Sequence, residues 1–208
     1  VVTHARSLAA VHGFDVTLVT TDSQEEPDWP YEHLAHLHVL ELADAQEQDF
    51  DVAVSTWWET AYSLFQLRAR RYASFVQSLE DRFYEGHESI ERLGARLTLD
   101  LPVAFITEAE WIEKTLAELR PDASVRLVRN GIDKETFAEV DAPTEHSGPL
   151  RVLVEGDPES WFKEIPESLK AVRGMEEPAE LTLVCPTRGG LRPEYAAMAT
   201  GPLTGPEM

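Results

Sequence analysis

The chain has 208 residues, of which 43% are hydrophobic and 9% aromatic, and its formal net charge is −20. This length and composition allow a buried core in one large or two small domains. The negative charge argues against nucleic-acid binding, because there is no excess of lysine and arginine to neutralise phosphates.

Cys185 is the only cysteine, so the chain can form no internal disulfide, which fits a reducing compartment. No apolar run approaches the roughly 20 residues of a membrane-spanning helix. We therefore expect a cytoplasmic protein without a transmembrane segment.

Apolar runs typical of strands alternate with helical patterns along the first 130 residues. The expected helices cover residues 3–12, 57–71 and 108–119, with a further short helix between 78 and 100. The expected strands cover residues 15–20, 36–42, 50–56, 72–77, 102–107 and 125–128. Thr56 and Thr107 stand directly before two of the helices, where a side-chain oxygen can cap free N–H groups. Arg68, Arg70 and Arg71 would end the helix at 57–71, where the helix dipole favours cations.

The stretch AEVDAPTEHSGP, residues 138–149, is rich in Pro, Gly, Ser and acidic residues and has no periodicity, which is typical of a linker. After it come an expected strand at 150–156, a helix at 163–172 and a strand at 180–186. This order predicts an α/β fold with Rossmann-like, mostly parallel sheets and helices on both faces. We assign residues 1–140 to a first domain, 141–149 to the linker and 150–208 to the beginning of a second Rossmann-like domain.

Four segments, taken in order, resemble family 4 glycosyltransferases (glycosyl transferases group 1) of the GT-B fold. HARSLAAVHGFDVTLVTTD, residues 4–22, is similar to the family's first helix and second strand. YASFVQSLEDRFYEG, residues 72–86, is similar to a rhamnosyltransferase-like branch. VRLVRNGIDKETF, residues 125–137, resembles the "V..IPNGVD...F" segment that ends the acceptor domain. LRVLVEGDPESWFKEIPESLKAV, residues 150–172, resembles the opening of the donor domain, "VLYVGR....KG...LL.A".

The resemblance implies an enzyme that moves a sugar, with retention of configuration, from a nucleotide sugar to an acceptor hydroxyl in glycan or polysaccharide assembly. Such enzymes have two Rossmann-like domains that face a cleft, and they need no cofactor or metal. The partners implied are the nucleotide sugar, with dTDP-rhamnose one expectation, and a glycan or small-molecule acceptor.

The chain also departs from the family pattern. The family's first strand and glycine-rich loop should precede Val1, and its paired glutamates, E-x7-E, should lie beyond Met208. The first strand is central in a doubly wound sheet, so two alternatives stay open: the natural protein begins earlier, or something else fills that position, for which a homodimer or strand exchange is one candidate. Asp157 replaces the arginine of "GR", and Glu164 replaces the glycine of "KG".

The expected catalytic and acceptor-binding residues follow predicted parallel strands, whose carboxyl ends are where ligands of α/β proteins bind. Glu80 is the candidate general base and Gln77 a hydrogen-bonding partner of the substrate. The candidates for acceptor binding are Thr56, Trp57, Glu59 and Thr107. The simpler alternatives are a solvated acidic loop around Glu80, a core position for the tryptophans and a capping role for the threonines.

The expected donor-binding residues are Asn130, Gly131, Gly156 and Lys163. Gly131 would take a positive φ in an Asn-Gly turn and let the backbone approach a ligand, with Asp133 capping the next turn. Gly156 would let phosphate approach backbone N–H groups, and Lys163 would neutralise the diphosphate. An ordinary turn, a strand-end glycine and a solvated lysine are the alternatives.

The sequence predicts no metal site, because His33, His36 and His38 lack a fourth ligand at suitable spacing. Thr187–Gly190, TRGG, could cradle an anion, but a flexible loop explains it more simply. Two other functions remain open. One is a GT-B sugar-nucleotide epimerase, and the other is a non-catalytic interaction domain that has lost its donor site, as Asp157 would indicate.

Overall fold

The computed structural model describes residues 2–21, 37–132, 134, 137–138, 148–158, 160–185, 192–196 and 199–200. The chain forms two compact units, Val1–Asn130 and Gly131–Met208. Most of the expected linker at 141–149, together with His33, His36, Asp133 and Thr187–Gly190, lies outside the described residues. In the described ranges, no helix has the length and apolar character that crossing a membrane requires.

Unit 1 contains two parallel sheets, as the alternation of strands and helices predicted. Strands β1 (Thr17–Thr20) and β2 (His38–Glu41) pair in parallel with each other. The larger sheet has the order β3-β4-β5-β6, and every pair in it is parallel. Its strands are β3 (Asp49–Ser55), β4 (Arg68–Val76), β5 (Ala104–Thr107) and β6 (Val125–Leu127). The α/β class with parallel sheets is therefore confirmed.

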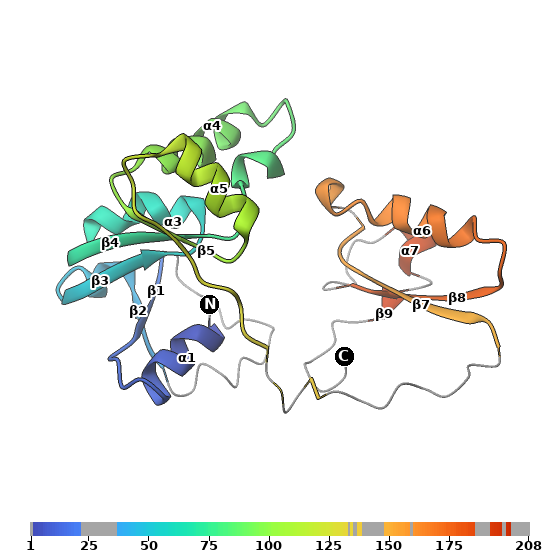
Figure 1. Cartoon of the computed structure of the whole chain (residues 1–208), viewed down its shortest axis with the longest axis horizontal. Coiled ribbons are helices and arrows are strands. Elements are labelled where there is room, and N and C mark those ends of the chain that lie inside the picture. Colours follow the sequence, from blue (N-terminus) through green and yellow to red (C-terminus); the bar gives the residue numbers. More distant parts are fainter. Residues whose placement is uncertain are drawn as a thin grey trace. The chain divides into compact units, whose positions relative to one another are not determined.

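Helices lie on both sides of the four-stranded sheet. Figure 1 shows α3 (Trp58–Ser63), α4 (Ser89–Leu97) and α5 (Glu110–Leu119) on one side, and α1 (Val2–Ala10) on the other. The His4 ring of α1 lies 6.1 Å from the Phe75 ring of β4. The short helix α2 (Leu42–Ala45) joins β2 to β3. Single 3-10 turns cover Leu64–Gln66 (η2), Glu80–Phe83 (η3) and Thr98–Asp100 (η4).

The core of unit 1 lies between the four-stranded sheet and α5. Phe105 of β5 and the α5 residues Ile112 and Leu116 have no exposed surface, and they cluster with Ala53 of β3 and Val76 of β4. Leu116 follows Ile112 by four residues, so both side chains lie on one face of α5. Their burial supplies the main stabilisation of this layer, at about 1.5–3 kcal/mol for each large apolar side chain.

The helix expected at 57–71 is wrong in its second half. Helix α3 ends at Ser63, a 3-10 turn follows, and the chain becomes strand β4 at Arg68. Arg68 and Arg70 therefore do not end a helix. They form ion pairs of 3.3 and 3.1 Å with Asp49 and Asp51 of the neighbouring strand β3. These ion pairs are exposed and contribute little to stability. The arginines and the aspartates are each spaced two residues apart, which is the period at which the side chains of a strand return to the same face.

Strand β3 forms an edge of its sheet, because β4 is the strand with which it pairs in the described part of the chain. Its side chains alternate, with Ala53 and Ser55 buried while Val52 and Val54 are 51% and 45% exposed. Parallel sheets are normally covered on both faces. The surface of β3 that carries the two valines is therefore unusually open for such a sheet.

Unit 2 contains a parallel sheet of order β7-β8-β9 with helices beside it. Its elements are β7 (Leu150–Glu155), η5 (Trp161–Lys163), α6 (Ile165–Arg173), β8 (Ala179–Val184), α7 (Pro193–Ala196) and β9 (Ala199–Thr200). Ile165 and Leu169 of α6 pack with Leu183 of β8 and Tyr195 of α7 in a small core. Pro166 stands in the first turn of α6, where the missing N–H has no cost.

Gly156 is fixed in its conformation by the packing of unit 2. Its φ is +144°, and its N–H donates to the Val184 carbonyl at 2.9 Å. A Cβ at this position would lie 2.7 Å from Cδ1 of Ile165. Glycine is therefore required here both by the backbone and by the core.

We expect Gly156→Ala to destabilise unit 2 by about 2–3 kcal/mol, because it adds backbone strain and overpacks Ile165. Gly131→Ala is the matched control, since its added methyl would meet no atom within 4 Å. Denaturant unfolding followed by circular dichroism measures both variants. Equal stability of Gly156→Ala and the wild type would contradict this account of the glycine.

Candidate functional site

The carboxyl ends of β3, β4, β5 and β6 lie along one edge of the larger sheet. The register pairs Val76 with Thr107 and Thr107 with Leu127, and it pairs Ser55 with Ser74 two residues before the end of β4. The ends of these strands and the segments that follow them contain seven of the ten residues expected from the sequence to bind ligand or catalyse. Parallel pairing thus gathers polar residues that are distant in sequence at one edge.

Glu80 opens the 3-10 turn η3, just after β4, and its side chain is half-buried. Its Oε2 atom accepts a hydrogen bond of 2.7 Å from the backbone N–H of Trp58, the first residue of α3. Burial raises the pKa of Glu80 to about 7, and the hydrogen bond from Trp58 opposes part of that rise. A carboxyl group of this kind exchanges its proton near neutral pH, which is what a general base requires.

Trp57 lies beside Glu80 and is 36% exposed. Its indole is stacked on the Phe83 ring, with centroids 6.0 Å apart and an angle of 11° between the planes. The indole Nε1 donates to Oε2 of Glu59 at 3.2 Å. These two contacts fix the orientation of an exposed aromatic ring at the sheet edge.

Trp58 connects the start of α3 to Tyr84 and to α4. Its Nε1 donates to the Tyr84 hydroxyl at 2.7 Å, and the two rings meet edge to face. A Cβ at Gly94 of α4 would lie 2.8 Å from the Trp58 ring, so the helix approaches this ring closely because residue 94 is glycine. The alternative of a structural role for the tryptophans therefore describes Trp58, which is half-buried, better than Trp57.

The N-terminus of α3 is capped by Thr60, not by Thr56 as expected. The Thr60 hydroxyl accepts from the backbone N–H groups of Thr56 and Trp57 at 3.3 and 3.2 Å. The Thr56 carbonyl accepts from Nε2 of Gln77 at 3.4 Å, which ties the ends of β3 and β4 together. Gln77 is exposed and next to this edge, as the sequence predicted from its place after the strand.

Thr107 is fully buried and does not cap α5, whose N-cap residue is Ala109. Within the described residues its hydroxyl has no hydrogen-bond partner in the protein. Since the side chain has no exposed surface, it offers no direct contact to an acceptor in this conformation. Thr107 is therefore not part of an acceptor-binding surface in this conformation.

Asn130 lies at the end of unit 1, where its Nδ2 donates to Oε2 of Glu108, just beyond β5. The neighbouring Arg129 forms an ion pair with Glu110. The expected turn at Gly131 is wrong, since Gly131 is not among the glycines with positive φ and residues 128–132 form no turn. The two side-chain contacts hold the segment along the carboxyl edge instead of reversing it.

Unit 2 brings Gly156 and Lys163 close together, because a Cβ on Gly156 would lie 4.0 Å from Cβ of Lys163. Lys163 is exposed, and its Nζ lies 5.8 Å from the centre of the Phe162 ring. Glu164, the N-cap residue of α6, has φ +49° and is the non-glycine residue with positive φ among those described. An exposed lysine thus precedes the first turn of a nine-residue helix.

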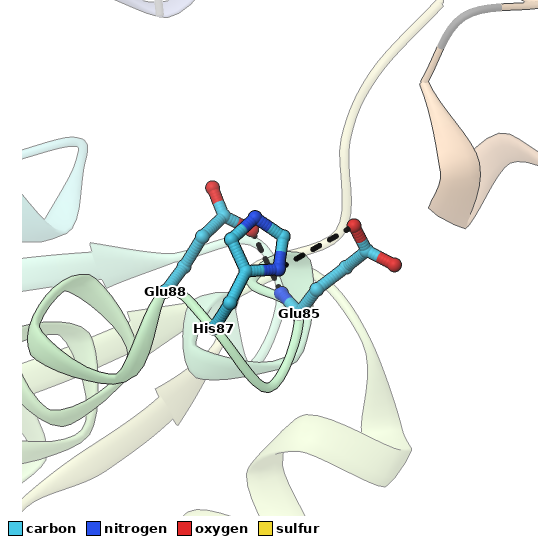
Figure 2. Close-up of side chains that lie close together, drawn as sticks. All are labelled: Glu85, His87 and Glu88. Carbon is cyan, nitrogen blue, oxygen red and sulfur yellow. Dashed lines mark hydrogen bonds and ion pairs between the residues drawn. The ribbon is translucent and has the colours of Figure 1, made fainter.

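A second polar group lies between η3 and α4. Glu85, His87 and Glu88 bring their possible ligand atoms within 4.8 Å of one another (Figure 2). The Glu88 carboxylate already accepts from the Glu85 N–H at 2.8 Å, and His87 Nδ1 lies 4.0 Å from the Glu85 carboxylate. Glu85 and His87 are exposed, so the group is equally explained as a solvated turn. The histidine cluster considered from the sequence was His33, His36 and His38, and His87 lies outside it. His38 contacts Thr17 at 3.5 Å.

Neither the comparison with models of protein families nor the comparison with curated proteins gives a match to this chain. The class that the structure itself defines is an α/β protein with parallel sheets and a polar carboxyl edge. Function must therefore be argued from the geometry of that edge.

Two contacts of the candidate residues were not predicted from the sequence. They are the Phe83 ring that stacks on Trp57 and the Trp58 N–H that donates to Glu80. A weak signal for Phe83 exists, because it follows Glu80 by three residues, the spacing of one helical turn. The Trp58 contact has no such signal, because it joins residues 22 positions apart through backbone geometry.

We expect Glu80→Gln to stabilise the protein at pH 8 but much less at pH 5. The folded state holds the Glu80 proton up to about pH 7, whereas an unfolded carboxyl releases it near 4.5, so stability falls as the pH rises between these values. After allowance for solvent screening, the gain at pH 8 is about 1 kcal/mol.

The measurement is the melting temperature of Glu80→Gln and of the wild type between pH 5 and 8. Glu118→Gln, on the exposed side of α5, is the control and should follow the wild type. A difference between Glu80→Gln and wild type that is the same at every pH would refute the assignment of a neutral, half-buried carboxyl.

Proposed function

We propose that this chain comes from a cytoplasmic family 4 glycosyltransferase of the GT-B fold. The enzyme would transfer a sugar from a nucleotide-sugar donor to an acceptor hydroxyl in the assembly of a glycan or polysaccharide. The observation that carries the proposal is Glu80, a half-buried carboxyl with a pKa near 7 at the carboxyl edge of a parallel sheet, beside an exposed tryptophan.

Glu80 would act as the general base of the transfer. The acceptor oxygen forms a bond to the anomeric carbon of the donor sugar on the face from which the diphosphate departs, so that the configuration is retained, and the bond from that carbon to the diphosphate breaks. The acceptor proton passes to Glu80, and the nucleoside diphosphate leaves. One carboxylate oxygen is held by the Trp58 N–H, so the other oxygen remains for the acceptor hydroxyl.

The adjoining residues would bind the acceptor. Gln77 and Glu59 are exposed, and the Gln77 amide is held by the Thr56 carbonyl while Glu59 is held by the Trp57 indole. Each of these side chains keeps hydrogen-bonding capacity for sugar hydroxyls. Thr56 contributes through its backbone in this arrangement, because its carbonyl orients Gln77.

Unit 2 would contribute to donor binding through Lys163. The position where the resembled family has the glycine of "KG" is Glu164, and its φ of +49° is a conformation that glycine adopts readily. The backbone thus agrees with the family pattern although the side chain does not. This agreement supports the resemblance in the opening of unit 2, where Asp157 departs from it.

The non-catalytic alternative is favoured by one observation at Gly156. The positive φ of this glycine and its contact with Ile165 account for it fully, without a phosphate group nearby. A protein that kept the scaffold and lost its donor site would keep this glycine too. The donor site is therefore where the transferase proposal is tested most directly.

A thermal-shift titration with UDP, GDP, dTDP and their sugars tests the donor class. We expect one nucleotide to raise the stability of the protein, by about 2.7 kcal/mol at 100 times its Kd. If no nucleotide shifts the melting temperature, the transferase proposal fails and the interaction-domain alternative replaces it.

Once a donor is identified, Glu80→Gln should lower kcat at least about 100-fold, the usual contribution of a general base. Activity of the wild type should rise with pH through about 7, because the base must lose its proton before it can act. Initial rates of sugar transfer between pH 5.5 and 8.5 give both results. Full activity of Glu80→Gln would show that Glu80 is not the general base. The transferase proposal would then depend on the nucleotide titration alone.

A further inference from the structure

Trp57 combines exposure with a fixed orientation, which is uncommon for a large aromatic side chain at a surface. The Phe83 ring supports one face of its indole, and the Glu59 carboxylate binds its N–H. The backbone at Trp57 is extended, with φ −151° and ψ 150°, between the end of β3 and the start of α3. The ring is therefore preorganised, and a ligand that stacks on it has little ordering entropy to lose.

Two carboxyl groups contact the start of α3, one through the Trp57 indole and the other through the Trp58 backbone. Oε2 of Glu59 is bound to the Trp57 indole and Oε2 of Glu80 to the Trp58 N–H. Within the described part of the chain, the second oxygen of each has no protein donor. A flat apolar surface next to free hydrogen-bond acceptors fits a molecule that has an apolar face and hydroxyl donors along its rim.

A pyranose ring has this chemistry. Its axial C–H groups form an apolar face that packs on an aromatic ring, and its hydroxyl groups donate to carboxylates. A nucleobase would also stack on the indole, but the phosphates attached to it would meet the Glu59 carboxylate in a protein of net charge −20. The charges therefore favour a neutral sugar over a nucleotide at this place.

We propose that Trp57, stacked on Phe83 and bound at its indole N–H by Glu59, is a platform for an uncharged pyranose ring of the acceptor, with Glu80 held by the backbone N–H of the next residue. That the bound sugar is an acceptor rests on the proposed function, but binding of the sugar to the platform is measurable without any transfer reaction. It assigns to Trp57 the selection of a saccharide acceptor, with the hydroxyl that reacts directed toward Glu80.

The test is saturation-transfer NMR of the 208-residue chain with neutral methyl pyranosides of gluco, manno, galacto and rhamno configuration. At least one should bind in the millimolar range, and Trp57→Ala should weaken its binding about tenfold or more. Trp111→Ala is the matched control, because Trp111 is also exposed, at 49%, but lies on α5. Phe83→Leu should weaken binding less than Trp57→Ala, because it removes the support and leaves the indole.

Circular dichroism and melting curves establish that each variant is folded before its binding is measured. If a folded Trp57→Ala binds as well as the wild type, the platform is refuted. It is also refuted if no pyranoside binds at about 0.1 M, which is roughly 100 times a millimolar Kd. Competition of UDP or dTDP with a bound pyranoside would overturn it as well, because the site would then accept nucleotides.

Nucleotide thermal shifts on the same samples separate this inference from the proposed function. A nucleotide shift without pyranoside binding would refute the platform and leave the transferase proposal standing. Pyranoside binding that depends on Trp57, without any nucleotide shift, would support a saccharide-binding platform in a protein that is no transferase.

Discussion

The hydrogen bond from the Trp58 N–H to the Glu80 carboxylate organises the carboxyl edge of unit 1. It joins the start of α3 to the turn that follows β4, and so it fixes two neighbouring crossovers relative to each other. Trp57 stands one residue before the donor and Phe83 three residues after the acceptor, so the same bond sets the distance at which their rings stack. Both the candidate base and the aromatic ring lie within a few residues of this contact, in which Oε2 of the half-buried Glu80 accepts from the backbone at 2.7 Å.

The fold class and the place of the candidate residues could be predicted from the sequence because both follow from alternation. Runs such as FDVAVS and PVAFIT form strands, and polar residues directly after them must lie at one edge when the strands are parallel. Residues 68–71 were misassigned because RARR favours a helix about as well as a strand, and only their partners Asp49 and Asp51 decide the matter. Burial of Thr107 and the absence of a turn at Gly131 depend on tertiary packing, which local pattern does not contain.

Glu164 shows a different relation between sequence and structure. A glutamate in a left-handed conformation costs about 1 kcal/mol, yet the backbone of unit 2 imposes it before α6. In this conformation Ile165 packs in the core of unit 2, with its Cδ1 atom 2.7 Å from the position that a Cβ on Gly156 would occupy. Backbone geometry at this turn is thus determined by the packing of Ile165, and the residue at position 164 is free to vary at a modest cost in stability.

The open edge of β3 has a consequence for how copies of the protein interact in solution. In the described part of the chain, the outer backbone groups of β3 beside Val52 and Val54 pair with no other strand, so they are a template for a further strand, and β3 itself contains no proline to block pairing. A net charge of −20 on each copy opposes such encounters by repulsion. Added salt shortens the range of that repulsion to about 8 Å at physiological ionic strength and less above it, while it leaves backbone hydrogen bonding unchanged. Ionic strength therefore sets the colloidal behaviour of this protein, with low salt keeping copies apart and high salt favouring contact along the edge.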